Sequence, residues 1–587
     1  MAVAGSRRLV QAALALALVP LGTGCEARTP AAKAGPQQVR INQLGFAPGS
    51  QKLALVEGAG AVRFEVVAEG RRKPVLEGVL SAPAHWEPAG LDAAVADLSA
   101  LSAPGRYRLQ VEGLPPSDPF VVDARAYEGV AAGALKGFYF HRASVALDRA
   151  HAGRWARKAG HPDDKVLIHA SAASPQRPAG STISAPGGWY DAGDYGKYIV
   201  NSSITMWSLL AAAEHYPGFF DERDVGIPES GNAVPDILDE SLWNLQWMLD
   251  MQDPADGGVY HKLTTLQFSG VVMPHQDTAP RYVVAKSTAA TLDFAAVMAM
   301  ASRVYAPYEA QFPGLSQRMA AAAKSAWAWA QANPQVEYRQ PADVGTGAYG
   351  DSYLEDEFAW AAAELFLLTG EPAYWDGFVQ RAAEPKVPNW ADVAALGWIS
   401  LAQHLPKLPD DAAREKVRGG LLEVARKLQE QQAQSPWKVA MQAQDFRWGS
   451  NSTVLNQALL MLQGYRLEGD RALLDAAQSQ LDWVLGRNPL GVSFVTGFGL
   501  RTPMHPHDRL SMADGVREPV PGWLSGGPNP AQQDASDCSG VTYPSKLPAL
   551  SWIDHDCSYA SNEVAINWNA PLVYVAAAVQ SLTPGPH

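Results

Sequence analysis

The sequence predicts an N-terminal β-sandwich followed by a large all-α domain. Residues 39–123 contain short apolar or alternating segments broken by Gly and Pro, at intervals typical of a sandwich. From about Tyr127 to the C-terminus, Ala-, Leu- and Trp-rich segments of helical period follow one another. A length of 587 residues also favours several domains, because one core seldom grows that large.

Strands are expected in the first domain at 39–41, 52–56, 62–67, 75–80 and 107–111. No catalytic chemistry is visible there, and we expect this domain to pack on the next one and stabilise it. Helices are expected at 127–150, 199–216, 235–252, 286–306, 316–332, 355–369, 391–405, 411–433, 452–467, 471–486 and 564–581. Several long loops separate these helices, and such loops usually carry function.

The first 25 residues are predicted to be an export signal. Their apolar core, residues 9–19, is too short to span a bilayer. The small residues before Cys25 resemble a bacterial lipoprotein cleavage box, although Gly22 stands where that box carries a larger aliphatic residue. We favour lipidation of Cys25 over simple secretion, with residues 26–37 as a linker.

Charge and composition limit the class of partner. The chain is 47% hydrophobic and 18% charged, which describes a globular protein. A formal net charge of −13 argues against a nucleic-acid partner, which needs clustered Lys and Arg. A neutral polysaccharide suits an acidic protein. We expect a monomer that touches a membrane only through a lipid anchor, at the outer membrane or cell surface, or else a periplasmic or secreted protein.

Two carboxylates, Asp191 and Asp194, lie in a run of glycines and aromatic residues from Gly187 to Tyr198. Glycine permits tight turns and close approach to a ligand, and aromatic rings offer flat faces that suit a sugar. Turn formation alone would explain the glycines and acids. The interleaved aromatics favour a site in which one acid activates a water and the other orients it.

Glu563 opens an apolar helical segment near the C-terminus. A glutamate at a helix start is often only a dipole partner. A carboxyl set against Val, Ile and Trp also acquires the raised pKa that a general acid needs. Together with the two aspartates, Glu563 fits a hydrolase with one carboxylate base and one carboxylic acid.

Cys538 and Cys557 remain as a pair once Cys25 is assigned to the signal. Export makes a disulfide between them the simpler interpretation, and two free thiols the alternative. A bridge would fix the loop that leads into Glu563, with a stabilisation of about 3 kcal/mol.

The runs GGWYDAGDYGKY at 187–198 and SNEVAINWNAPLV at 561–573 resemble the two signatures of glycoside hydrolase family 9, mostly endo-β-1,4-glucanases. Segments 232–240, 286–291 and 488–499 are similar to further parts of that family. The resemblance implies an (α/α)6 barrel for the helical domain. The start of the first domain resembles the immunoglobulin-like module of many relatives. The implied domains are 1–25 (signal), 26–37 (linker), 38–124 (immunoglobulin-like) and 125–587 (barrel).

The family resemblance also implies an inverting mechanism. Inversion places a carboxylic acid at the glycosidic oxygen and a carboxylate across the ring, roughly 6.5–9.5 Å away, with a water between. By motif position Asp194 is the base, Asp191 helps to hold the water and Glu563 is the acid. No cofactor is required for this chemistry.

Substrate contacts follow from the same resemblance. His507 and Arg509 match a His-His-Arg motif that holds sugar hydroxyls, with Asp508 in place of the second His. A solvated polar loop is the alternative for this segment. Three tryptophans are the expected sugar platforms: Trp189, Trp448 and Trp568.

Metal binding is expected at one place only. Family members often carry structural calcium, and Ser352, Asp356 and Glu357 resemble ligand positions, with Asp392 as a distant partner. A helix-capping acidic cluster is the equal alternative. Zinc is not expected, because Ala143 and Gly160 stand near the positions of the relatives' cysteine ligands and only His161 remains.

The predicted function is an inverting endo-β-1,4-glucanase that hydrolyses β-1,4-glucan poly- or oligosaccharides. The first alternative is an exo-acting β-glycosidase of the same family, an exo-β-glucosaminidase or a cellodextrinase, because loop lengths decide between them. The second is a non-catalytic glycan-binding lipoprotein, and the presence of all three acids argues against it.

Overall fold

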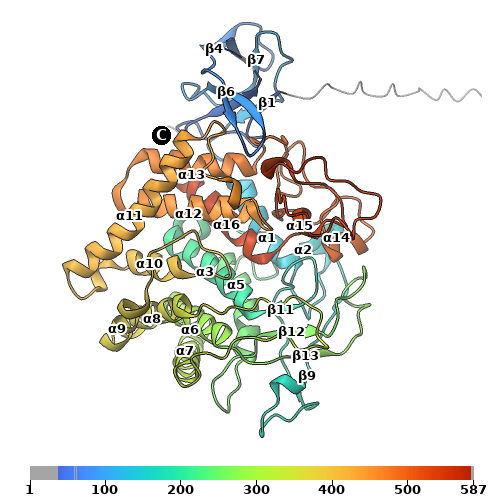
Figure 1. The fold of residues 1–587 in the computed structure, drawn as a ribbon, viewed down its shortest axis with the longest axis vertical. Helices are drawn as coiled ribbons and strands as arrows, with labels where there is room; N and C mark the ends of the chain where they lie inside the picture. Colours follow the sequence, from blue (N-terminus) through green and yellow to red (C-terminus); the bar gives the residue numbers. More distant parts are fainter. Residues whose placement is uncertain (1–37, 59, 61, 584–587) are drawn as a thin grey trace, which may run out of the picture. The chain divides into compact units, whose positions relative to one another are not determined.

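The computed structural model describes residues 38–58, 60 and 62–583 (Figure 1). The predicted signal peptide, the lipidation site Cys25 and the linker 26–37 lie outside the described residues. None of the helices in the described part is long and apolar enough to cross a membrane.

The N-terminal domain is a sandwich of two antiparallel four-stranded sheets. One sheet has the order β1 (Val39–Arg40), β2 (Leu53–Glu57), β6 (Leu91–Asp97), β5 (Ala84–Trp86), and the other β4 (Pro74–Val79), β3 (Arg63–Ala68), β7 (Gly105–Val111), β8 (Phe120–Val122). Alternation sets the inward face: β7 buries Tyr107, Leu109 and Val111 and exposes the residues between them. The sequence did not indicate β5, β6 and β8, which are either very short or rich in alanine, a weak strand former.

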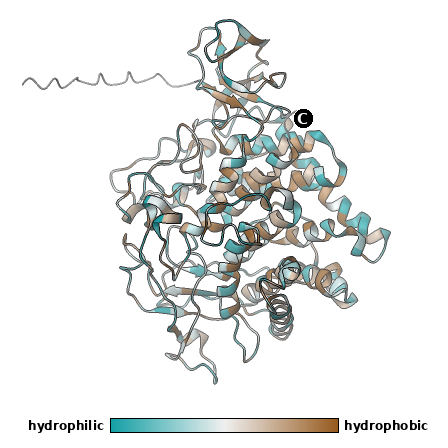
Figure 2. Ribbon diagram, turned by 180° about the vertical axis from the view of Figure 1, so that it is seen from behind, coloured by the Kyte–Doolittle hydropathy of each residue, from teal (hydrophilic) through white to brown (hydrophobic). Residues whose placement is uncertain are grey.

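The C-terminal domain is an (α/α)6 barrel, as predicted. Six inner helices, buried almost all round, are α3 (Ile199–His215), α6 (Thr288–Tyr305), α8 (Glu355–Thr369), α10 (Ala394–Gln403), α12 (Ser450–Glu468) and α16 (Ile566–Leu582). The outer helices are α1 (Glu128–Phe140), α5 (Asp236–Asp250), α7 (Leu315–Ala332), α9 (Pro372–Arg381), α11 (Asp411–Gln434) and α13 (Arg471–Val484). Figure 2 shows continuous hydrophobic stretches along the barrel helices.

Two helices differ from the sequence prediction. Helix α9 was not expected, and it begins with Pro372 at its first turn, a residue that also suits a loop. Helix α1 ends at Phe140, ten residues early, because the chain turns there and continues as the short α2 (Arg149–Ala152). Three other short helices are α4 (Pro217–Phe220), α14 (Arg509–Ala513) and α15 (Tyr559–Asn562).

The barrel domain also carries a small five-stranded sheet that the sequence did not indicate. Its order is β10 (Thr182–Ile183), β9 (Val166–Ile168), β13 (Arg281–Val283), β12 (Lys262–Thr265), β11 (Lys197–Tyr198). Strands of two to four residues are too short to give a readable period. The sheet leads directly into α3, so it helps to place the residues before that helix.

The two domains share buried contacts, as expected for a stabilising module. Trp86 of β5 lies against Trp437 and Trp483 of the barrel domain, with ring centroids 5.9 and 5.7 Å apart. The side chain of Asn42 donates a 2.7 Å hydrogen bond to the buried carboxylate of Asp482 on α13. The sandwich therefore completes part of the barrel's core.

The inner helices start at one rim of the barrel. Asp191 and Asp194 precede α3, Glu563 precedes α16, and Trp448 precedes α12. Each inner helix packs on its neighbours in the order α12, α16, α3, α6, α8, α10. Loops far apart in the sequence therefore meet at this rim, where helix N-termini provide positive potential.

Candidate active site

The turn that carries the two aspartates requires glycine at two positions. A Cβ atom on Gly193 would lie 2.3 Å from the carbonyl oxygen of His507, so only glycine permits this close approach. A Cβ atom on Gly196 would lie 2.7 Å from the Oδ2 atom of Asp194. The glycine-rich run thus packs the aspartate turn directly against the segment that carries His507.

Asp191 and Asp194 are both buried and have separate sets of hydrogen-bond donors. Asp191 accepts hydrogen bonds from the side chains of Asn201 and Tyr349, the latter over 2.8 Å. Asp194 accepts from the Gly196 backbone N–H at 2.9 Å and from the Tyr198 hydroxyl at 3.2 Å. Burial, reinforced by the charge of Asp194, raises the pKa of Asp191 to about 8. The neutral form of the Asp191 carboxyl is thereby favoured.

Glu563 lies between the aspartate turn and helix α16. Its backbone carbonyl accepts a 2.8 Å hydrogen bond from the Gly526 N–H, and the neighbouring Asn562 carbonyl accepts one from the His507 N–H at 2.9 Å. Desolvation, followed by the charges of Asp194 and Asp191, raises the pKa of the Glu563 carboxyl well above its ordinary value. Glu563 therefore retains its proton where an ordinary glutamate is ionised.

Tyr349 and Tyr198 touch the aspartates, and the sequence analysis did not identify either residue. Tyr349 has a φ of 46°, which is unusual for a bulky side chain and costs backbone energy. Its ring packs edge-on against Tyr198 and against Trp390, at 4.8 and 5.1 Å. A non-glycine residue in this backbone conformation cannot be recognised from residue types alone.

His507 and Arg509 lie beside the aspartate turn. The Nδ1 atom of His507 lies 2.6 Å from the Asp556 carbonyl oxygen, and its Nε2 atom has no hydrogen-bond partner among the described residues. Arg509 donates from Nη1 to the Gly193 carbonyl at 2.5 Å and from Nε to the Ser269 carbonyl at 2.9 Å. Part of the guanidinium is therefore occupied by the protein itself.

Asp508 caps the short helix α14. Its carboxylate accepts hydrogen bonds from the backbone N–H groups of Leu510 and Ser511, at 3.2 and 3.1 Å. An N-cap of this kind fixes the start of the helix and the direction of the adjacent Arg509.

The three predicted tryptophan platforms differ in exposure. Trp189 is fully buried, donates its indole N–H to Glu240 at 2.8 Å and packs on Phe138, so its prediction as a sugar platform was wrong. Its neighbouring glycines turn the ring inward, which the motif alone does not show. Trp448 is 44% exposed and Trp568 is partly exposed beside Gly449.

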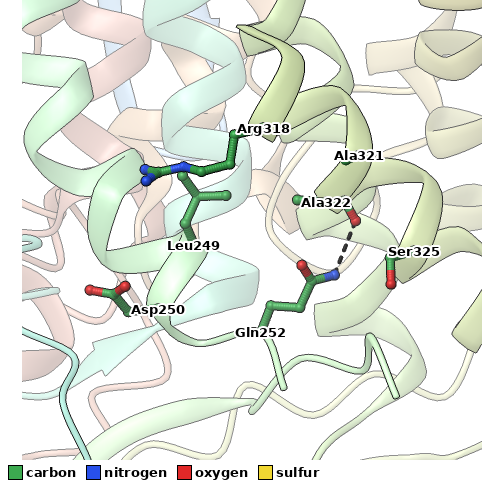
Figure 3. Close-up of a pocket in the computed structure, with 7 residues that line it drawn as sticks. All are labelled: Leu249, Asp250, Gln252, Arg318, Ala321, Ala322 and Ser325. Carbon is green, nitrogen blue, oxygen red and sulfur yellow. Dashed lines mark hydrogen bonds between the residues drawn. The ribbon is translucent and has the colours of Figure 1, made fainter. Parts of the chain in front are cut away.

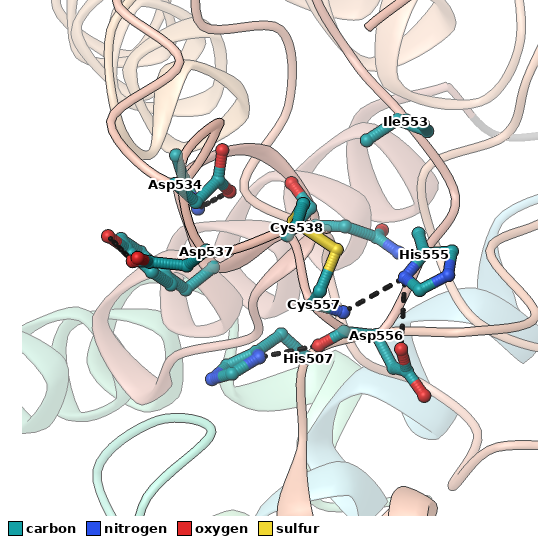
Figure 4. The surroundings of a disulfide bond; sticks show 12 residues. His507, Asp534, Asp537, Cys538, Ile553, His555, Asp556 and Cys557 are labelled. Atoms are coloured by element: carbon teal, nitrogen blue, oxygen red, sulfur yellow. Dashed lines mark hydrogen bonds and ion pairs between the residues drawn. A yellow bond between two sulfur atoms is a disulfide. The ribbon is translucent and has the colours of Figure 1, made fainter. Parts of the chain in front are cut away.

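The Cys538–Cys557 disulfide lies next to the His507 contact (Figure 4). The two Cα atoms are 5.3 Å apart, within the usual range. Asp556, which precedes Cys557, supplies the carbonyl that meets the His507 ring. The ring of Tyr559 lies 5.4 Å from that of Trp448 and 6.0 Å from that of His507. The bridge therefore braces the segment that positions both side chains.

Several carboxyl groups gather around the first turn of α8, near the predicted calcium residues. Asp356 and Glu357 are buried, Asp392 is partly exposed and Ser352 is exposed. The fully buried Asp293 of α6 joins them, and neither of its oxygens has a hydrogen-bond partner among the described residues. No three His, Cys, Asp or Glu side chains of the described part are arranged as a metal site in this conformation.

His161 has protein partners in place of a metal. Its Nδ1 atom lies 2.9 Å from the Tyr190 hydroxyl and its Nε2 atom 3.2 Å from Asp277. A Cβ atom on Gly160 would lie 2.3 Å from the backbone of Pro274, so no larger residue fits there without a shift.

Two surface pockets lie elsewhere on the barrel. One, of about 350 Å³, lies between the end of α5 and helix α7 and is lined in part by Leu249, Gln252 and Arg318 (Figure 3). The other, of about 400 Å³, is lined in part by Trp327 and Arg381. Neither lining includes a predicted site residue, so the three carboxyl groups at the rim remain the candidate active site.

Comparisons with known proteins agree with this geometry. The family profile described as Glycosyl hydrolase family 9 matches residues 127–576, and that of the Cellulase N-terminal ig-like domain matches residues 34–115. The chain belongs to glycoside hydrolase family 9. Both the predicted family and the predicted accompanying domain are thereby confirmed.

Relatives in the family include named endoglucanases. A xyloglucan-specific endo-β-1,4-glucanase of Bacteroides ovatus is 42% identical over 93% of this chain and 94% of its own length. Endoglucanase D of Acetivibrio thermocellus is 31% identical over 92% and 83%. A solved Bacteroides ovatus family 9 structure has a TM-score of 0.87 at 40% identity, covering 93% of this chain and 99% of that one. A thermostable endoglucanase from Alicyclobacillus acidocaldarius gives 0.84 at 34% identity, covering 93% and 100%.

These similarities confirm the prediction of a glycoside hydrolase that acts on β-glucans as an endo-β-1,4-glucanase. An inverting mechanism is typical of family 9.

Proposed function

We propose that this family 9 endo-β-1,4-glucanase uses Asp194 as the catalytic base, Asp191 as the partner that orients water, and Glu563 as the catalytic acid. The observation that carries the assignment is the contrast in environment between the desolvated Glu563 and Asp194, which two donors hold. Glu563 has a pKa raised well above normal by desolvation and by the two aspartates. Asp194 accepts from a backbone N–H and a phenol, donors that stabilise a carboxylate.

The proposed reaction uses Glu563 as a proton donor and Asp194 as a proton acceptor. The protonated Glu563 gives its proton to the glycosidic oxygen while the bond from that oxygen to the anomeric carbon breaks. A water on the opposite face of the sugar attacks that carbon and loses a proton to Asp194. Asp191, held by Asn201 and Tyr349, keeps the second water contact in place. All proton transfers involve carboxyl groups, so no cofactor enters the chemistry.

Substrate binding is assigned to exposed groups around these acids. His507 offers its Nε2 atom to a sugar hydroxyl while Nδ1 is held by the Asp556 carbonyl. Trp448 presents a half-exposed face for stacking, and the partly exposed Trp568 lies beside the next residue, Gly449. Arg509 already donates from Nε and Nη1 to two backbone carbonyls, and its other N–H groups are assigned to the substrate. Xyloglucan, the polysaccharide named for the Bacteroides ovatus relative, is the first substrate to test.

The testing experiment is a product profile with purified protein lacking residues 1–25. The substrates are carboxymethylcellulose, mixed-linkage β-glucan, xyloglucan, cellohexaose and chitosan oligomers, and the Glu563→Gln variant is assayed alongside. A rapid fall in viscosity with mixed oligomer products, absent in the variant, is the expected result. Release of monomer or dimer without viscosity loss would instead establish exo action, and glucosamine as product would identify an exo-β-glucosaminidase. An Asp194→Asn variant with near-full activity would remove that residue from the scheme.

We also propose that calcium binds the acidic cluster at the first turn of α8. Asp293, Asp356 and Glu357 each have a buried oxygen without a hydrogen-bond partner among the described residues, and such a group of carboxyls calls for a neutralising cation. Asp356 is already fixed by the Val393 N–H at 2.9 Å. Asp293 replaces the exposed Ser352 as a predicted ligand, and Asp392 remains at the edge. Calcium there would hold the start of α8 against α6.

The remaining proposals concern export, lipidation and oligomeric state. We propose export through the first 25 residues, lipidation at Cys25 and a monomeric state. The small residues before Cys25 support the anchor. Mass spectrometry of the protein expressed in a bacterial host, with a Cys25→Ser control, distinguishes a lipid-modified N-terminus from simple cleavage.

A further inference from the structure

Phe268 is a half-exposed aromatic side chain beside the candidate active site. The side chain is 49% exposed, and the guanidinium of Arg509 lies over its ring, 5.6 Å from the centroid. The same guanidinium bonds to the carbonyl of Gly193, which separates the two aspartates in sequence. One arginine therefore links the exposed ring to the turn that carries the catalytic base.

The loop that carries Phe268 is held in place by partly buried hydrogen bonds. The Ser269 carbonyl accepts from Arg509 at 2.9 Å, and the Val272 carbonyl accepts from the Tyr195 hydroxyl at 2.6 Å. Further along, the Asp277 carboxylate lies 3.2 Å from His161. A ring on a fixed loop loses little conformational entropy when it binds a ligand.

The loop that carries Phe268 lies between β12 and β13. Strand β13 is followed by α6, whereas Trp448 directly precedes α12. Helices α3 and α16, which follow the aspartates and Glu563, pack between α6 and α12 (Figure 1). Helices α3 and α16 therefore separate the segment that leads to α6 from the segment that carries Trp448, and both of these helices begin next to the three carboxyl groups.

We infer that Phe268 is a stacking platform for a glucose unit of the substrate, on the side of the cleavage point opposite to Trp448. The inference rests on the proposed function. A glucan chain stacked on both rings passes over the carboxyl groups between them and has sugar units bound on both sides of the broken bond. Single exposed apolar residues are common on protein surfaces. Phe268 differs from them by its fixed loop and its arginine link to the aspartate turn.

The test compares cleavage positions in cellohexaose labelled at its reducing end. The variants are Phe268→Ala, Phe268→Tyr and Trp448→Ala, with Val379→Ala as the control. Val379 is 41% exposed on the outer helix α9 and has no place in the proposed machinery. Loss of a platform weakens binding on its own side only, so the preferred cleavage position moves along the substrate.

The expected result is a displacement of the cleavage position in opposite directions for Phe268→Ala and Trp448→Ala. KM for cellohexaose rises roughly tenfold in Phe268→Ala while kcat changes little, because stacking away from the reacting bond contributes uniform binding. Phe268→Tyr retains the ring and behaves as the wild type. A cleavage pattern and KM identical to the wild type in Phe268→Ala, or a displacement in the same direction as Trp448→Ala, would overturn the inference.

A binding measurement separates this inference from the proposed function. Calorimetric titration of cellohexaose into Glu563→Gln, with and without Phe268→Ala, needs no turnover. A several-fold weaker Kd in the double variant supports the platform, and an unchanged Kd contradicts it. Absence of cleavage of any β-glucan by the wild-type protein, together with a normal effect of Phe268→Ala on binding, would overturn the proposed function and leave the platform in place.

Discussion

Ile566 donates its backbone N–H to the carbonyl oxygen of Asp191 over 2.8 Å. The first residue of α16 is thereby bonded to the turn before α3, so the segments that carry Glu563 and Asp191 share a main-chain contact. A second contact joins the Arg509 N–H to the Gly193 carbonyl at 3.2 Å. Relative placement of Glu563 and the two aspartates therefore depends on backbone hydrogen bonds, which side-chain substitutions at these positions leave in place.

Replacement of Tyr349 by phenylalanine removes one donor to Asp191. The phenol donates to the Oδ2 atom of Asp191 at 2.8 Å, and the strained backbone of Tyr349 holds it there. We expect kcat on β-glucan to fall by about two- to tenfold, the scale of one hydrogen bond. Steady-state kinetics on cellohexaose measures this. A matched Tyr353→Phe variant, in which the ring is 56% exposed, keeps wild-type kcat. A wild-type kcat in Tyr349→Phe would show that Asn201 alone holds Asp191.

The raised pKa of Asp191 predicts how stability depends on pH. Its pKa is about 8 in the folded protein and 3.8 without the protein environment, so the folded state binds the extra proton between these values. The contribution of Asp191 to the free energy of unfolding is fully present below about pH 4. It is lost as pH rises toward about 8. The melting temperature of Asp191→Asn should therefore increase relative to the wild type as pH is raised through this window.

Thermal melting at pH 4, 6 and 8 measures this difference. Asp411→Asn is the control, because the Asp411 side chain is 99% exposed and its removal should leave the pH dependence unchanged. A constant difference in melting temperature between Asp191→Asn and the wild type across the range would contradict the raised pKa.

Family and fold were readable from the sequence because they depend on residue type and spacing. The glycines and acids of 187–198 stand in one continuous run, and helical period marks most barrel helices. The sequence did not show in which direction each side chain points. Trp189 lies in the same run as Asp191, yet its ring turns inward to Glu240. A sequence motif shows which residues are present. Whether a side chain is buried depends on the segments that pack over it in the folded protein.

Contacts between residues far apart in the chain could not be predicted from the sequence either. Tyr349 reaches Asp191 because α8 and α3 start at the same rim, and nothing near Tyr349 in the sequence marks it as a site residue. Asp293 joins the acids at the first turn of α8 from the second turn of α6 for the same reason. The short strands β9 to β13 form only through pairing with one another, so local propensity does not indicate them.

The proposed calcium site predicts that chelation destabilises the wild-type protein. Chelation leaves Asp293, Asp356 and Glu357 as a buried group of carboxyls that repel one another. We expect EDTA to lower the melting temperature and added calcium to restore it, because a ligand of the folded state stabilises by mass action. Differential scanning calorimetry measures both. In Asp293→Asn the response to calcium should be greatly reduced, whereas Asp411→Asn should respond as the wild type. Equal melting temperatures with EDTA and with calcium in the wild type would contradict the site.

Trp86 tests whether the immunoglobulin-like domain stabilises the barrel. Only 6% of its surface is exposed, and its indole packs among Trp437, Phe446 and Trp483 of the barrel domain. Truncation to alanine leaves a cavity at the contact between the two cores and should cost about 3–5 kcal/mol of the free energy of unfolding. Urea unfolding followed by tryptophan fluorescence measures this cost. Val79→Ala, 62% exposed on β4, should cost little by the same measurement.

Because no side chain of the catalytic rim changes, kcat of Trp86→Ala below its unfolding transition should equal that of the wild type. A large loss of kcat in the fully folded variant would show that the sandwich also positions the rim, through Asn42 and Asp482 on α13.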